Sequence, residues 1–205
     1  MIAVLRRLAG ASLEMRALRS TLFKLGGYGG TQAIRLGANL ILTRLLFPEA
    51  FGMMALVTVV LVGLSQFSDV GTATAILRSP RGDDPKFLNT AWTMQVVRGI
   101  VLWAVAAMIA GPMAAFYDTP MLASILPVAA ASLAIQGLRP TRMDTANRHL
   151  VFGRLTAVEL GTQTLAVLVG IALAWWTGSV WALVASALTA ALAEVALGWL
   201  LLSGN

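Results

Sequence analysis

Long apolar runs separated by short turns are the feature that most restricts the fold of this chain. Residues 36–47 and 51–64 form two such runs, and the second contains no charged residue. Pro48 stands between them. Proline cannot continue a helix interior and disfavours the helical conformation of the preceding residue, so this pattern predicts a helix that ends near Phe47. A second helix then follows a connection of about four residues, and a connection that short predicts two antiparallel neighbours.

The overall composition predicts that these helices lie in a membrane. Hydrophobic residues make up 58% of the chain and charged residues only 12%, with a mean hydropathy of +0.80. Soluble domains carry about 25% charged residues, so this chain has too few to cover a surface in water. The chain contains no cysteine, which excludes disulfides and thiolate metal sites.

The isoelectric point near 11.1 raises the alternative of nucleic-acid binding. The Lys and Arg residues, however, fall mainly in short segments between apolar runs. Basic residues in short connections are typical of membrane proteins, where they set the orientation. We therefore expect membrane lipid as a partner and no nucleic acid.

The sequence predicts an all-α, polytopic membrane protein with six transmembrane helices in one bundle. About 20 apolar residues are needed to cross a bilayer of about 30 Å. Within a bundle domain of residues 26–205, the predicted spans are 27–47, 51–70, 88–113, 120–138, 154–176 and 179–202.

Residues 1–25 form a separate segment in which leucines recur at helical spacing among basic residues. This pattern predicts a cytoplasmic, amphipathic helix on the membrane surface. A secretory signal peptide is the alternative. It is disfavoured because the basic residues continue through the whole segment and do not precede an uninterrupted apolar core.

The charges between the spans predict the orientation of the bundle. The segment 1–25 and the connections 71–87 and 139–154 are rich in basic residues, whereas the turns Pro48–Ala50, Tyr117–Pro120 and Thr177–Ser179 have none. All three basic stretches fall on one side of the predicted bundle. The excess of basic residues in cytoplasmic loops predicts that both termini are cytoplasmic.

Several ordered blocks of the sequence resemble a known family. They are LILTRLLFPEAFGMMALVTV, FSDVGTATAI, FLNTAW, ANRHLVFGRLTAVELG and SVWALV. The blocks are similar to the N-terminal half of the polysaccharide or oligosaccharide flippases of the multidrug/oligosaccharidyl-lipid/polysaccharide exporter superfamily. The resemblance implies a multi-pass protein of the bacterial inner membrane. It also implies that the chain moves a polyprenyl-diphosphate-linked oligosaccharide across that membrane for surface polysaccharide biosynthesis.

Members of that family are typically about twice as long, with two six-helix bundles around the substrate path. The resemblance therefore implies a second six-helix bundle as a partner, either from a homodimer or from a separate half. A truncated or half-size, non-transporting membrane scaffold or assembly component is the alternative function.

Polar residues inside the predicted spans are the candidate site, because ionisable groups at membrane depth are costly and face protein or watery cavities. Four-residue spacing places Thr31, Arg35 and Asn39 on one helix face. The predicted cavity residues are Thr31, Gln32, Asn39, Gln95, Glu159, Gln163 and Glu194.

Four arginines are candidates for binding an anionic headgroup, since a guanidinium offers two parallel donors to phosphate. Arg35 and Arg98 lie within spans, and Arg142 and Arg154 lie at the predicted cytoplasmic mouth. Glu159 and Glu194 would balance these arginines or bind a coupling cation or proton. The alternatives are structural pairing, such as Arg35 with Glu194 or Arg98 with Glu159, and extension of a charged side chain to the membrane interface.

No residue pattern supports an enzyme, so we expect no catalytic residue, metal or cofactor. His149 is the only histidine of the chain, and we expect it to face lipid headgroups. Asp83 and Asp84 stand between basic residues and are interpreted as a solvated turn.

Overall fold

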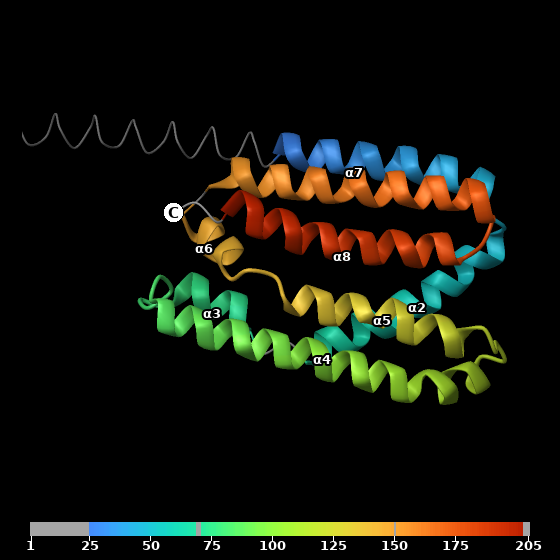
Figure 1. Ribbon diagram of the computed structural model, residues 1–205, viewed down its shortest axis with the longest axis horizontal. Coiled ribbons are helices and arrows are strands. Elements are labelled where there is room, and N and C mark those ends of the chain that lie inside the picture. The colour runs from blue at the N-terminus through green and yellow to red at the C-terminus, as the bar shows by residue number, and fades with distance from the viewer. Residues whose placement is uncertain (1–24, 69–70, 150, 203–205) are drawn as a thin grey trace, which may run out of the picture.

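The computed structural model describes residues 25–68, 71–149 and 151–202, and helices are the only regular secondary structure within these ranges. The prediction of an all-α fold is confirmed. A helix of residues 25–45, named helix 25–45 below, comes first (Figure 1). The helices that follow are α2 (Pro48–Phe67), α3 (Thr72–Arg78), α4 (Pro85–Phe116), α5 (Leu122–Gly137), α6 (Arg142–Arg148), α7 (Phe152–Thr177) and α8 (Trp181–Leu202).

Prolines begin two of the long helices. The fixed backbone angle φ of proline suits the first position of a helix. Pro48 opens α2 after an extended Phe47, so the predicted break between the first two helices is confirmed. Pro85 opens α4, and the Asp84 carboxylate accepts a hydrogen bond from the Lys86 amide at 3.0 Å. The interpretation of Asp84 as part of a turn is therefore refined, because its side chain caps a helix.

Four helices are long and apolar enough to cross a membrane, namely α2, α4, α7 and α8. They correspond to the predicted spans 51–70, 88–113, 154–176 and 179–202. The chain is thus a multi-pass membrane protein.

The predicted count of six spans is not reached within the described residues. The predicted span 120–138 corresponds to α5, which has 16 residues and reaches membrane length only together with α6, bent from it by 61°. Helix 25–45, at the predicted span 27–47, is long enough to cross a membrane but is not among the four candidate spans, because its arginines and amides lower its apolar character. The predicted surface helix 1–25 lies outside the described residues, apart from residue 25.

The long helices other than α2 run along one axis, α2 crosses them obliquely, and the bundle has two different ends (Figure 1). The basic end contains α3, α6, the connections around them and the last turn of α8. The closed end contains the three short turns at residues 46–47, 117–121 and 178–180. The basic connections predicted from the sequence therefore do lie at one end of the molecule.

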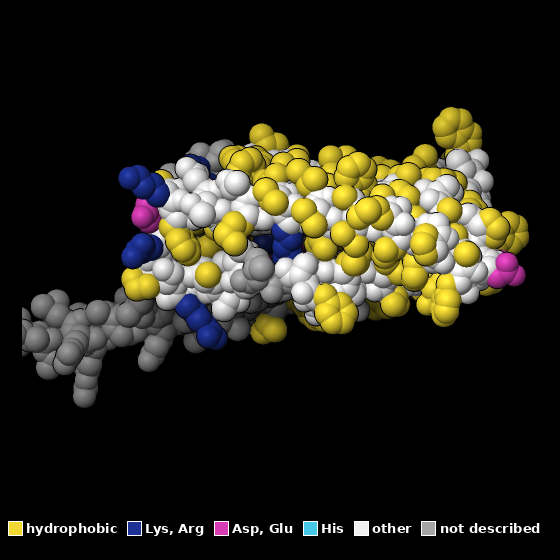
Figure 2. Space-filling view, turned by 90° about the horizontal axis from the view of Figure 1, so that it is seen from below, with side chains coloured by type: hydrophobic (Ala, Val, Ile, Leu, Met, Phe, Trp, Pro, Cys, Tyr) yellow, Lys and Arg dark blue, Asp and Glu magenta, His cyan; other side chains and the backbone are white. Residues whose placement is uncertain are grey.

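The main hydrophobic core lies toward the closed end. It includes Val57 of α2, Ile125 and Leu126 of α5, and Val184 of α8, all fully buried or nearly so. The outer surface is also apolar, and hydrophobic side chains cover most of the face in Figure 2. On that face, Lys and Arg side chains gather at one end and are recessed in a hollow part-way along. Apolar surface outside and polar side chains inside are typical of a helical membrane protein.

Candidate functional site

Two polar hollows lie in the half of the bundle nearer the basic end, and they share two residues. The α4 hollow, of about 480 Å³, includes Ser65, Gln66, Gln95, Arg98, Arg139 and Glu194. The α7 hollow, of about 440 Å³, includes Thr31, Arg35, Arg139, Asp144, Glu159, Thr162, Gln163 and Glu194. Arg139 and Glu194 line both hollows, so this ion pair stands between them.

The α7 hollow brings together five of the residues predicted from helix spacing. Thr31 and Arg35 come from helix 25–45, Glu159 and Gln163 from α7, and Glu194 from α8. Helix 25–45 approaches α7 closely, because a Cβ atom at Gly27 would lie 2.3 Å from the Thr156 methyl group. A larger residue here would force the Thr156 side chain to shift, so Gly27 allows the two polar helix faces to approach closely.

The α4 hollow contains two more predicted residues, Gln95 and Arg98. The Arg98 guanidinium donates from Nη2 to the Ser65 carbonyl at 2.6 Å and from Nε to the Ser68 hydroxyl at 3.0 Å. Gln95 donates to the Gln136 carbonyl at 3.2 Å. Arg98 therefore ties α4 to the end of α2, and Gln95 ties α4 to α5.

Arg139 is the centre of the charged cluster between the hollows. Its Nη1 lies 3.5 Å from Glu194 Oε1, and its Nη2 lies 3.3 Å from Asp144 Oδ1. Asp144 belongs to α6, outside the membrane-length helices. Burial raises the pKa of the Asp144 carboxyl above its ordinary value of 3.8, while the nearby Arg139 charge acts to lower it and Glu194 to raise it.

The two pairings considered from the sequence are not formed. Glu194 pairs with Arg139 and not with Arg35. Glu159 makes no ion pair within the described residues, so it does not pair with Arg98. Because Arg35 and Glu159 are both exposed on the walls of the α7 hollow, neither is sealed among packed side chains.

The structure places the other predicted site residues away from the hollows. Gln32 and Asn39 are exposed on helix 25–45 and line neither hollow. Arg142 and Arg154 line a third cavity of about 780 Å³, which we name the basic pocket. Its polar and aromatic walls include Asp83, Trp92, Arg142, His149, Arg154 and Trp199. The α6 segment separates the basic pocket from the α7 hollow. One face of this segment, with Arg142 and His149, lines the basic pocket, and another face, with Met143 and Asn147, lines the α7 hollow.

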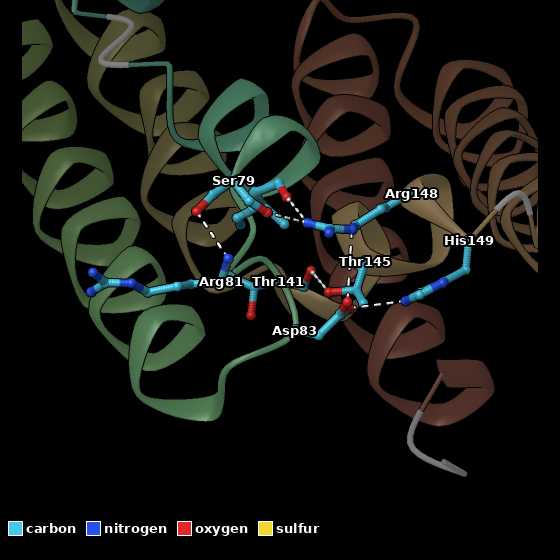
Figure 3. Close-up of polar contacts among 8 residues, drawn as sticks. Ser79, Arg81, Asp83, Thr141, Thr145, Arg148 and His149 are labelled. Carbon is cyan, nitrogen blue, oxygen red and sulfur yellow. Dashed lines mark hydrogen bonds and ion pairs between the residues drawn. The ribbon is translucent and has the colours of Figure 1, made fainter.

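A polar clamp holds the α3–α4 connection against α6 (Figure 3). Arg148 Nη1 donates to the carbonyls of Ile76, at 3.0 Å, and Ser79, and its Nε lies 3.7 Å from the Asp83 carboxylate. His149 Nε2 lies 2.9 Å from the same carboxylate. Asp83 is thus an ion-pair partner and not only part of a solvated turn, and His149 contacts protein at this atom.

Sequence reasoning missed Arg139, Asp144 and the clamp because it assigned residues 139–154 to a connection between two spans. The α5 helix ends at Gly137, and the following break turns α6 back across the basic end. Pro140 was the available signal, since a proline ends the preceding helix and restricts Arg139 beside it.

Residues 41–204 match a family model described as polysaccharide biosynthesis protein. No curated protein and no solved structure matches the chain significantly. The match covers α2 to α8 and therefore most of the residues of both hollows.

Proposed function

Because the chain belongs to the family of polysaccharide biosynthesis proteins, we propose that it translocates a polyprenyl-diphosphate-linked oligosaccharide across the bacterial inner membrane. The single observation that carries this proposal is the Arg139–Glu194 pair, which lines two polar hollows inside an otherwise apolar bundle. Ionisable side chains at such positions are expensive in lipid and mark the paths of ions and polar substrates.

The charges of the two hollows suggest different roles. In the α4 hollow, the guanidinium groups of Arg98 and Arg139 line the described part of the wall, and guanidinium groups suit the oxygens of a diphosphate. In the α7 hollow, Asp144, Glu159 and Glu194 outnumber the arginines, which suits a coupling cation or proton. Thr162 also lines this hollow, and its hydroxyl oxygen is buried without a hydrogen-bond partner within the described residues.

Arg98 and Arg139 of the α4 hollow are the proposed headgroup ligands, whereas Arg35 lines the α7 hollow. Arg142 and Arg154 line a different cavity on the other side of α6, so we leave them out of this path. The excess of basic residues in the connections at the basic end favours placing that end at the cytoplasmic face. The cargo headgroup would then enter from the side where the hollows lie.

We also propose a companion bundle, either a second copy of this chain or a separate half, against helix 25–45. Gln32, Arg35 and Asn39 are all exposed on this helix, and lipid is a poor environment for such side chains. The chain has no cysteine, so single-cysteine crosslinking is direct. We expect Asn39→Cys to form a crosslinked product in native membranes and Leu168→Cys, which is 58% exposed on α7, to remain monomeric.

Complementation of a strain that lacks its own flippase tests the transport proposal. We expect the wild-type chain to restore surface polysaccharide, and Arg98→Ala and Glu194→Gln to lose most of that activity while inserting normally. Arg44→Ala is the matched control, because Arg44 is exposed near the closed end and lines none of the three cavities.

Two outcomes would contradict the proposal. Equal activity of the Arg98 and Glu194 variants with the wild type would exclude the hollows from the substrate path. Failure of the wild type despite correct insertion would favour a non-transporting scaffold or assembly component.

A further inference from the structure

The basic pocket has the composition of an anion site at the end of the bundle. It lies among the start of α4, α6, the start of α7 and the last turn of α8. We propose that it binds the phosphate headgroup of an anionic phospholipid. This proposal does not rest on transport, because the pocket is separated from the two hollows by α6.

The positive charge of the pocket comes from Arg142 and Arg154. Asp83 is its acidic residue, and that carboxylate already pairs with Arg148 and His149 in the clamp. Within the described residues, Arg154 makes no ion pair, and Arg142 makes one long hydrogen bond, 3.5 Å from Nη1 to the Leu202 carbonyl. Two guanidinium groups are therefore available to an anion, and the geometry of a guanidinium suits phosphate oxygens.

Trp92, one of the residues that line the pocket, also carries an unsatisfied donor. The indole Nε1 of Trp92 is buried and has no hydrogen-bond partner within the described residues. Trp199, on the opposite wall, differs because its Nε1 donates to the Leu138 carbonyl at 3.2 Å. A buried donor without a partner costs free energy, and an acceptor such as a phosphate oxygen would remove that cost.

The position and the walls of the pocket favour a lipid over a soluble phosphate. Two membrane-length helices end here, since α4 begins at Pro85 and α8 ends at Leu202. Tryptophans are enriched at the level of lipid headgroups, and Trp92 and Trp199 both line this cavity. Leu88 and Leu202 give it apolar walls that acyl chains can contact. Basic pockets between transmembrane helices are known to take anionic headgroups.

Native mass spectrometry of the purified full chain, with phosphatidylglycerol and phosphatidylcholine supplied together, tests this site. We expect the wild type to retain phosphatidylglycerol preferentially. Each basic residue near a headgroup contributes several-fold in affinity, so R142Q/R154Q should lower that preference about tenfold. The matched control is R78Q/R81Q, which removes the same charge from two exposed arginines at the same end but outside the pocket.

Trp92→Phe removes the indole donor and should reduce the preference by a smaller factor, while circular dichroism verifies the helix content of each variant. If the double variant does not fold, the single variants R142Q and R154Q carry the test, each with a loss of about threefold. Inorganic phosphate alone is titrated in a parallel arm.

Three results would overturn the proposal. The first is equal retention of both lipids by the wild type, and the second is an equal loss in R78Q/R81Q, which would make the effect one of net charge. The third is displacement of phosphatidylglycerol by inorganic phosphate at equal concentration, which would assign the pocket to a soluble phosphate.

Discussion

The closed end and the basic end of this bundle are held together by different contacts. Toward the closed end, apolar side chains from α2, α4, α5, α7 and α8 fill one continuous core, and the turns are short. Toward the basic end, the helices surround polar hollows, and ion pairs and side-chain-to-carbonyl bonds connect them. Tight apolar packing makes the closed end the rigid part of the molecule, and the polar half has contacts that water or a ligand can replace.

The largest effect should come from opening a cavity in the core near the closed end. Leu126 on α5 is fully buried, and Leu126→Ala should lower the free energy of unfolding by about 2 kcal/mol. This is the lower part of the range for soluble proteins, because lipid is as apolar as the core and only packing is lost. Thermal unfolding in detergent micelles measures the change. Leu168→Ala removes the same atoms at an exposed position and should have little effect; equal losses in both variants would remove the distinction between core and surface.

A second prediction concerns the glycines where α4 and α5 touch beside the α4 hollow. A Cβ atom at Gly99 would lie 2.7 Å from the Leu133 carbonyl oxygen, which is backbone and cannot move aside. Gly99→Ala should therefore destabilise the bundle by about 1–2 kcal/mol. Gly111→Ala on the same helix meets no atom within 4 Å and should be neutral or stabilising, since alanine favours helix. The same unfolding experiment compares them, and a stable Gly99→Ala would show that α4 and α5 can separate.

Sequence reasoning predicted the parts of this fold that depend on local chemistry. The predicted break at Pro48 does separate two helices, and the spacing of Thr31, Arg35, Glu159 and Gln163 did identify residues that line one hollow. These features depend on backbone geometry and helix periodicity, which a single sequence carries.

The remaining features depend on contacts between distant segments. The count of six spans was too high for the described helices, because α5 ends early and helix 25–45 is too polar. The sequence placed Arg139 and Asp144 in a connection between spans. The 61° bend between α5 and α6 brings them instead to the charged cluster between the two hollows. A bend of this size is set by tertiary packing, and no local pattern in the sequence indicates its direction.

A third prediction tests whether the clamp stabilises only the basic end of the bundle. Arg148→Gln removes donors to two carbonyls and an ion pair with Asp83. Both side chains of the ion pair are partly exposed and water can replace these contacts, so we expect a total loss of about 1 kcal/mol. Because these contacts join short segments, we expect faster hydrogen exchange in residues 72–84 with little change near Leu126. Arg81→Gln is the control, since the Arg81 side chain is exposed and points away from the clamp (Figure 3). Uniform loss of protection along the chain would mean that the clamp supports the whole bundle.

The smallest expected effect comes from the Asp144 carboxyl at the edge of the charged cluster. Burial raises its pKa, so between 3.8 and the raised value the native state holds a proton that the unfolded state has released. Stability conferred by this group is therefore fully present below pH 3.8 and is lost as the pH rises through the folded pKa. In Asp144→Asn this dependence of stability on pH is absent, and Arg139 can still pair with Glu194.

We accordingly expect the melting temperature of the Asp144→Asn variant, relative to that of the wild type, to increase from pH 4 toward neutral pH. This increase should be smaller than the fall in melting temperature caused by Arg148→Gln. Thermal unfolding in detergent across that range measures the difference. Asp118→Asn is the control, because Asp118 is exposed at the closed end and its left-handed backbone, with φ of 49°, also suits asparagine. A melting temperature that depends on pH in the same way in wild type and Asp144→Asn would show that the charge of Arg139 fully offsets burial, and the basic end would then resemble the closed end in its indifference to pH.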